Sequence, residues 1–517
     1  PISSLLQDKF GALGTGAFEP EDVEEAPTYE AVPGTIDASP ELLIKVLKGT
    51  NNRTSPGPDG INYKTLKMVN KSMPSLLSDL YKACIRFSAF PAEWKVGKVV
   101  WLLKEGKDPY TTGAYRPVTL LSNLGKTFEK VIAEAMYNHI AASGCISKQQ
   151  YGFMRGRGTE DAIKALLKKV RASFPLHRFV VGTALDIAGA FDNVQWSTVY
   201  CELAKMKFPS SIRNMLKSYL TERMAFSEEH GISLTRGCPQ GSVLGPLIWN
   251  ITYNYVIKGL TTSLQHVICY ADDTIIINTG KSLKDVQLKV ETASEKAASL
   301  LKRAGLLFNE AKTEIVVFKG GQQASSVYEP LKFKVFGKEI TSKPSLKYLG
   351  VYIDEKLDFY RHFLYLEEKS TKLIPKLVAV CQRTCGYSNS ARKTMFTATI
   401  GAIYKYACTA FGHTTERNRK LIESVDRKVQ QCCARLYSKA GYYAATVINK
   451  MPPLELQIVS RYLKTCQAKG WPILKQTVLA PPERSLGTEE YSERVQCSLR
   501  SAWGNRYKKR PVIGVGR

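Results

Sequence analysis

Three aspartates lie in sequence contexts that could bring their carboxylates together. Asp186 stands near the end of an apolar, strand-like run over residues 178–187. Asp272 and Asp273 separate two short apolar runs, a pattern that is typical of a tight β-hairpin with acids at its tip. If the two strands lie side by side in one sheet, all three carboxylates converge at its edge.

Carboxylates so close together would repel one another strongly unless divalent cations neutralised them. Oxygen ligands of this kind suit Mg²⁺, which retains water and binds substrate phosphates. Two such ions can activate a 3′-hydroxyl and stabilise the leaving pyrophosphate in an in-line displacement. An Asp-Asp pair is also ordinary chemistry for a turn alone, so the pair by itself leaves both interpretations open.

The segments that contain these acids resemble the conserved motifs of reverse transcriptases. Residues 185–192 (LDIAGAFD) are similar to motif A, and residues 270–273 (YADD) are similar to motif C. Between them, residues 236–246 (RGCPQGSVLGP) resemble motif B of the non-LTR, LINE-type retrotransposons. The order of the three motifs and their separations are highly specific to this kind of polymerase.

Further segments resemble motifs that flank this core in the family, and the resemblance covers about residues 40–460. They are an upstream cluster at 55–60, fingers motifs at 115–122 and 150–153 with Gly158-Thr159, and the primer-grip segment at 346–351. The Cys-Pro-Gln-Gly-Ser variant of motif B looks most like the insect clade that inserts into ribosomal RNA genes or telomeric repeats, as does the Leu-Ile-Trp-Asn after it.

The resemblance implies an α+β fold, the right-hand polymerase with fingers, an antiparallel palm sheet and a helical thumb. The expected divisions are an acidic N-terminal extension at 1–50, fingers at 51–180, a palm at 181–358, a thumb at 359–450 and a basic C-terminal segment at 451–517.

The resemblance also implies roles for the acids and their neighbours. Asp186 and Asp272 would be the principal ligands of two Mg²⁺ ions, for which Mn²⁺ can substitute, with Asp273 and Ile187 as further metal-binding positions. Phe191 falls where reverse transcriptases place an aromatic ring under the sugar, and a ring there would collide with a 2′-hydroxyl. The alternative is that Phe191 is a plain core residue.

Four polar residues are implied to contact the substrates. Gln240 would lie near the incoming nucleotide and the template base, although a Gln that only fixes its turn is the alternative. Lys104 and Arg116 would supply cations to the triphosphate, with Lys107 close enough to replace Lys104, or Lys104 could be plain solvated surface. Lys312 matches the motif D lysine, which would protonate pyrophosphate or steady the triphosphate.

The elements that must position these residues can be read from local signals. Ser39, Pro40 and Glu41 form a helix start, and that helix is expected to end near Gly49. Residues 1–38 are acidic and contain prolines, which predicts a loosely structured lead-in. Helical patterns are expected at 61–90, 122–142, 159–172 and 195–222, and a basic helical region at 360–450.

Charge and composition favour a polyanionic partner. The chain carries a net charge of +27, yet residues 1–50 hold nine acids against three bases, so the excess lies beyond them. No apolar run approaches the roughly 18–20 residues of a membrane span. The twelve cysteines form no CxxC pair. Cys381 and Cys385 could share a helix face, and buried thiols are favoured there over metal binding.

The resemblance therefore implies an RNA-directed DNA polymerase that copies retrotransposon RNA into cDNA by target-primed reverse transcription. The expected partners are an RNA template, a DNA primer or nicked target DNA, and dNTPs, without a membrane. An endonuclease domain is expected elsewhere in the full-length protein, and the site of action is expected to be the nucleus. The alternatives are a telomerase-like or domesticated reverse transcriptase, a viral RNA polymerase, and a non-catalytic nucleic-acid-binding protein of this fold.

Overall fold

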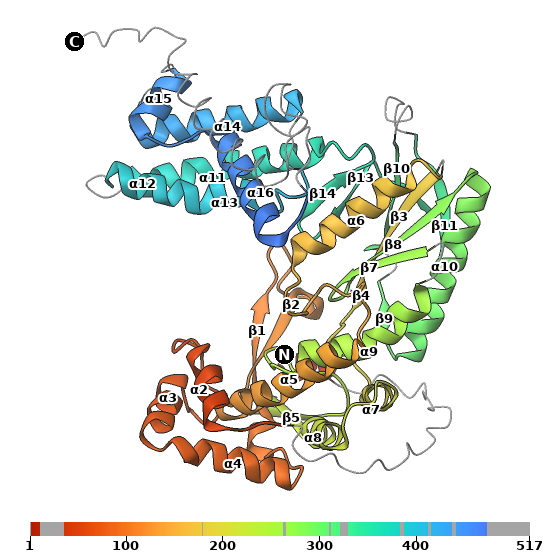
Figure 1. Ribbon diagram of the computed structural model, residues 1–517, viewed down its shortest axis with the longest axis vertical. Helices are drawn as coiled ribbons and strands as arrows, with labels where there is room; N and C mark the ends of the chain where they lie inside the picture. Colours follow the sequence, from red (N-terminus) through yellow and green to blue (C-terminus); the bar gives the residue numbers. More distant parts are fainter. Residues whose placement is uncertain are drawn as a thin grey trace.

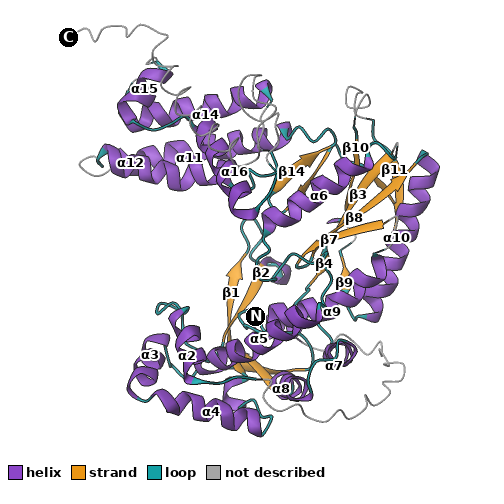
Figure 2. Cartoon of the chain, viewed as in Figure 1, coloured by secondary structure: helices purple, strands orange, loops and turns teal. Residues whose placement is uncertain are grey.

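The computed structural model of the chain describes residues 2–10, 36–177, 179–261, 265–309, 312–320, 329–382, 387–411, 415–436 and 441–472. It combines helices with antiparallel sheets, which confirms the predicted α+β class. Figures 1 and 2 show a body that contains the sheets, with helices from residues 40–86 at its lower end and helices from residues 360–469 at its upper end.

The central sheet has four antiparallel strands in the order β10, β3, β8, β7. These are β3 (Phe179–Leu185), β7 (Gln265–Tyr270), β8 (Asp273–Gly280) and β10 (Glu314–Phe318). Three helices pack against it, namely α6 (Thr159–Ser173), α9 (Gly245–Leu260) and α10 (Leu283–Arg303). Ile275 and Ile277 share a hydrophobic cluster with α6, whereas Ile276 joins the cluster of α9 and α10. This alternation buries both faces of the sheet.

A second sheet joins segments that are distant in the sequence, in the order β2, β1, β5, β6. Its strands are β1 (Val96–Leu103), β2 (Tyr115–Leu120), β5 (Arg223–Ser227) and β6 (His230–Leu234). The pairing of β1 with β5 is parallel, and the other two pairings are antiparallel. Residues 223–234 fall within the expected palm range, yet they pair with a strand of the expected fingers.

Short strand pairs complete the strand structure of the described residues. They are β4 (Ile187–Ala188) with β9 (Leu307–Phe308), β11 (Lys332–Val335) with β12 (Lys338–Thr341), and β13 (Ser345–Tyr348) with β14 (Val351–Asp354). The last hairpin holds the expected primer-grip segment.

The N-terminal residues differ from the expectation of a loosely structured lead-in. Residues Ile2–Phe10 form helix α1, which packs against β5 and β6. Leu6 is buried there, and the Phe10 ring lies 6.5 Å from the Trp101 ring. The prolines that suggested an irregular segment, Pro20 and Pro27 among them, come later, at positions outside the described residues.

The helix that was expected to start at Ser39 is confirmed as α2 (Pro40–Lys48), with the Ser39 hydroxyl accepting from Leu42 N at 3.3 Å. Two longer expected helices are each divided in two. The pattern at 61–90 becomes α3 (Tyr63–Ser72) and α4 (Pro74–Arg86), and the pattern at 195–222 becomes α7 (Trp196–Lys205) and α8 (Ser210–Leu220). Both divisions occur at a proline, Pro74 or Pro209, because proline cannot continue a helix that precedes it.

Of the remaining helices, those expected at 122–142, 159–172 and 360–450 are confirmed, whereas α9, α10 and α16 (Leu454–Lys469) were not expected. The pattern at 122–142 is α5 (Asn123–Ser143). The basic region at 360–450 is helical as expected, with α11 (Tyr360–Gln382), α12 (Asn389–Phe396), a π-helical turn at Thr397–Gly401, α13 (Ala402–Lys405), α14 (Glu416–Ala434) and α15 (Tyr442–Asn449). Helix α16 lies beyond this region. Short 3₁₀ turns stand at Ala92–Trp94 and Thr112–Ala114. No described helix is both long and apolar enough to cross a membrane.

Two polar contacts explain how the last helices are held. The buried Asp426 carboxylate accepts from Tyr442 Oη at 2.6 Å and from Leu454 N at 2.8 Å, which joins α14 to α15 and α16. Lys469 Nζ lies 3.1 Å from Asp161, which joins the end of α16 to α6. Cys385 and the basic residues after 472 lie outside the described residues, so the expectations for them stay predictions.

Candidate active site

The register of the central sheet brings the three predicted aspartates to one edge. Leu185 of β3 lies opposite Thr274 of β8, so Asp186 leaves β3 beside the β7–β8 turn. Asp272 lies within that turn and Asp273 is the first residue of β8. The predicted hairpin with acids at its tip is therefore confirmed, and so is the predicted convergence.

The charges of these acids act on one another. Burial raises the pKa of Asp273 to about 6, with further raising by Asp272 and then Asp186. Burial also raises the pKa of Asp272, which Asp186 raises further, whereas the cations Lys312 and Arg116 oppose the shift. The edge of the sheet is thus a concentration of negative charge that favours cations.

A second segment fixes the turn that carries Asp272. The backbone of Ala271 is left-handed, with φ of 58°, a conformation that non-glycine residues adopt at a cost. Buried Gln150 supports it, because its Oε1 accepts from Ala271 N at 3.1 Å and its Nε2 donates to Ala271 O at 3.3 Å. A Cβ at Gly152 would lie 2.1 Å from Ala271 N, so only glycine permits this close approach.

The predicted cations surround the same edge. Lys312 Nζ lies 3.0 Å from Asp186 Oδ2, although its side chain remains 65% exposed. Lys104 donates to Gly113 O at 2.8 Å. Burial lowers the pKa of Lys104, and the neighbouring cations Lys9, Arg116, Lys312 and Lys107 lower it further. The structure therefore places Lys104, Arg116 and Lys312 within one basic group beside the acids.

Phe191 is half-buried and packs against the hydrophobic core. Its ring centroid lies 6.0 Å from that of Phe153, in an edge-on arrangement, and 5.9 Å from that of Trp249 on α9. Its backbone carbonyl accepts from Cys238 N at 2.8 Å, which links motif A to motif B. Phe191 thus combines core packing with a partly exposed ring, and its assignment to sugar selection stays a prediction.

Gln240 lies in a turn that two neighbours hold. Its Nε2 donates to Asp192 Oδ1 at 3.0 Å, and its carbonyl accepts from Thr119 N at 2.7 Å. Burial raises the pKa of Asp192, although the hydrogen bond from Gln240 and the charges of Lys9, Lys104 and Arg236 oppose this. The side chain of Gln240 is thereby directed toward motif A.

The donor set fits a hard divalent cation without forming a complete cage. Among the described residues, no three His, Cys, Asp or Glu side chains stand close enough to form a ready-made metal site. Asp186 is instead paired with Lys312. Mg²⁺ needs no full protein cage, since it keeps several waters and shares substrate phosphates. Ile187 is buried and pairs with Phe308, so only its backbone carbonyl has an atom that could reach a metal.

Several residues that shape the site were missed from the sequence. Gln150 and Asp192 stand inside the quoted motifs, but their partners are far away in the chain. Their signal was a polar residue within an otherwise apolar or glycine-rich motif. Lys9 was missed because the prolines of the lead-in suggested irregular structure, whereas α1 carries Lys9 close enough for its charge to act on Asp192.

Comparison with known proteins agrees with this arrangement. The family described as reverse transcriptase (RNA-dependent DNA polymerase) matches residues 102–353. The putative 115 kDa protein of a type-1 retrotransposable element of Drosophila melanogaster is 29% identical over 501 residues, which are 95% of this chain and 48% of the relative. A Pol polyprotein from a type-1 retrotransposable element of Bradysia coprophila is 27% identical, over 88% of this chain and 45% of the relative.

The RNA-directed DNA polymerase from mobile element jockey of Drosophila melanogaster is 24% identical, over 76% of this chain and 43% of the relative. The chain thus spans about half the length of the curated relatives it matches. These relatives are insect retrotransposon proteins, as the motif resemblance predicted. The segment that carries the converging aspartates and much of the basic group beside them is thus similar to the reverse transcriptase family, and the chain is similar to proteins of insect mobile elements.

Proposed function

We propose that this chain extends a DNA primer on an RNA template with dNTPs and Mg²⁺. The observation that carries the proposal is that three aspartates converge at one sheet edge with three cations beside them. The aspartates are Asp186, Asp272 and Asp273, and the cations are Lys104, Arg116 and Lys312. Reverse transcriptases use divalent metal ions with an RNA template and a nucleic-acid primer. When bound, the ions would lower the pKa of the primer 3′-hydroxyl and stabilise charge on the phosphates.

The protein side chains would bind the metal ions and the triphosphate and select the sugar. The aspartates hold the cationic centre at the edge of the sheet, and Lys104 and Arg116 bind the triphosphate oxygens. Lys312 exchanges its contact with Asp186 for the phosphates, where its ammonium neutralises the departing pyrophosphate. Phe191 lies under the sugar and leaves no room for a 2′-hydroxyl.

We further propose that the primer is a nicked strand of target DNA in the nucleus, the mode that the family resemblance implies. The target would be a ribosomal RNA gene or telomeric repeat, and a separate endonuclease domain of the full-length protein would make the nick. The length of the curated relatives, of which this chain spans about half, leaves room for such a domain.

The chain itself should therefore need a nick that it cannot make. Hydrolysis of a phosphodiester by a second metal site would require its own cluster of ligands, and the acids that the sequence motifs single out, Asp186, Asp272 and Asp273, belong to the polymerase site. Supercoiled plasmid that carries a candidate target should stay intact on incubation with Mg²⁺. The same plasmid, nicked beforehand, should support DNA synthesis on an annealed RNA template. Site-specific nicking that persists in Asp186→Asn would show a second active site and contradict this proposal.

Binding to an RNA–DNA duplex should depend steeply on salt. The net charge of +27 and the exposed lysines of α11 and α14, such as Lys376 and Lys428, suit contacts to phosphates rather than to bases. Affinity should fall by about 1,000-fold between 50 and 200 mM salt, as for a protein with several phosphate contacts. Fluorescence anisotropy with two unrelated duplex sequences measures this, and both should show the same slope. A flat salt dependence would contradict the basic binding surface.

A further inference from the structure

Helix α9 follows the motif B turn, and the residue at its N-cap position is apolar. Leu244 stands at its N-cap position and has no side-chain oxygen to accept from the first backbone N–H groups. A carboxylate on α5 accepts from the turn that precedes the helix. Glu129 Oε2 accepts from Ser242 Oγ at 2.7 Å, from Val243 N at 2.7 Å and from Leu244 N at 3.0 Å.

This carboxyl group is buried, and a buried lysine stands near it. Glu129 is 1% exposed and Lys126, one turn earlier on α5, is 7% exposed. Burial lowers the pKa of Lys126, while Glu129 and Asp59 act in the opposite direction, so the ammonium lies within reach of both carboxylates. A negative charge at a helix N-terminus is also stabilised by the helix dipole. These contacts satisfy the carboxyl group of a glutamate that lies in the core.

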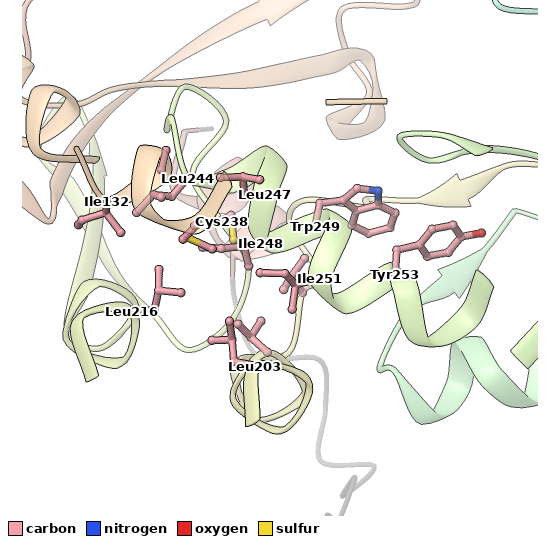
Figure 3. Packing of buried hydrophobic residues seen from close by; sticks show 14 of the residues in the cluster. Ile132, Leu203, Leu216, Cys238, Leu244, Leu247, Ile248, Trp249, Ile251 and Tyr253 are labelled. Carbon is pink, nitrogen blue, oxygen red and sulfur yellow. The ribbon is translucent and has the colours of Figure 1, made fainter. Parts of the chain in front are cut away.

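Ser242 extends the contact to a second helix. The Ser242 hydroxyl donates its proton to Glu129, so it can only accept from its other partners. Tyr219 Oη on α8 therefore donates to Ser242 Oγ at 2.6 Å, and Gly245 N donates to the same oxygen at 2.9 Å. Burial raises the pKa of Tyr219 and Glu129 raises it further, so the phenol keeps the proton that it donates. Figure 3 shows Leu244 and Leu247 of α9 in the same hydrophobic cluster as Ile132 of α5 and Leu216 of α8.

The turn that Glu129 holds is the one that carries Gln240. On its other side, the turn lies against β2, since Thr119 N donates to Gln240 O at 2.7 Å. A Cβ at Gly241 would be 2.4 Å from Thr119 O, and φ there is 133°, so the backbone has no freedom to shift toward β2. The backbone of Gln240 is therefore set between Thr119 on one side and Glu129 on the other.

We propose that Glu129 is a positioning residue for nucleotide selection, which holds the motif B turn so that Gln240 meets the base pair being formed. The proposal rests on the polymerase function proposed above. It assigns to α5 a role that does not require Glu129 to touch the substrate. Loss of the carboxylate would free the turn and weaken binding of the incoming dNTP, while the acids that carry out the chemistry remain in place.

Two measurements on Glu129→Gln and Glu129→Ala test this, with Glu134→Gln as the matched control. Glu134 lies on the same helix but pairs with Arg155 and Lys45. Hydrogen exchange of the amides of residues 240–245 should become about tenfold faster or more in Glu129→Ala, because Val243 N, Leu244 N and the Ser242 hydroxyl lose their acceptor. The control should leave this exchange unchanged.

Steady-state kinetics of primer extension should show a larger effect in Glu129→Ala than in Glu129→Gln. KM for the dNTP should rise about tenfold in Glu129→Ala and about threefold in Glu129→Gln, with kcat nearly unchanged, as for a loss of uniform binding. The glutamine side chain still accepts hydrogen bonds, so Glu129→Gln should lose much less affinity for the dNTP than Glu129→Ala. If Glu129→Ala does not fold, Glu129→Gln still tests the proposal. The proposal would be overturned if Glu129→Gln had the KM for the dNTP and the hydrogen exchange of the wild type. It would also be overturned if the variants only reduced the fraction of active protein and left KM and hydrogen exchange unchanged. Wild-type protein that extends no primer would refute the polymerase function instead, and the exchange of the turn would still test Glu129.

Discussion

Asp272→Asn should reduce primer extension on RNA by on the order of 1,000-fold or more, because a neutral amide cannot hold the divalent cations that the chemistry needs. The effect should be this large because Asp272 interacts with both other aspartates: Asp186 raises the pKa of Asp272, and Asp272 raises the pKa of Asp273. Affinity for the primer–template duplex should change little, since duplex binding rests on the basic surface. Single-turnover extension and anisotropy on the same preparation measure the two quantities.

Asp79→Asn is the matched control, because Asp79 lies on α4 with a side chain that is 67% exposed. It should extend primers like the wild type. The assignment of the acids would be wrong if Asp272→Asn retained near wild-type extension, or if its loss of extension were matched by an equal loss of duplex binding.

The second large effect is expected at Phe191. Replacement by valine should raise the incorporation of rNTPs relative to dNTPs by about 10- to 100-fold, the range that shape discrimination at a pocket provides. The half-buried ring packs on Phe153 and Trp249. A smaller side chain would open space on the sugar side, while the rings of Phe153 and Trp249 would stay in place. The ratio of kcat/KM for matched rNTP and dNTP pairs gives the result directly.

Phe174→Val is the matched control for this change. Phe174 is also half-buried, but it follows α6 and lies against Gly320, at the end of the central sheet away from the acids. Its replacement should lower stability without changing the ratio. An unchanged ratio in Phe191→Val would mean that the residue is only core and that sugar selection lies elsewhere.

Local signals in the sequence were sufficient for elements whose cause is local. The Ser39 cap, the apolar runs around Asp272 and the periodicity of α5 each act within a few residues, and each was predicted. The prolines at 74 and 209 could have divided the longer helices correctly, since the same physical rule applies to them. The resemblance supplied the convergence of the acids, which spacing alone left open.

Contacts between distant segments could not be predicted in the same way. The parallel pairing of β1 with β5 joins Val96 to Met224, and nothing in the local periodicity of either strand specifies that partner. Gln150 and Glu129 hold backbone groups more than a hundred residues away. A buried polar residue is detectable as a type in the sequence, but its partner becomes known only when the fold brings the two segments together.

The most direct test of the central claim is extension of a labelled DNA primer on an RNA template, with dNTPs or NTPs supplied in parallel and Mg²⁺ present or chelated. The chain should make full-length DNA from dNTPs with Mg²⁺, little product from NTPs, and none after chelation. Equal use of NTPs and dNTPs would indicate an RNA polymerase of the same fold. Tight duplex binding without any extension, in a preparation with intact hydrogen-exchange protection of the central sheet, would indicate a binding protein and contradict the account.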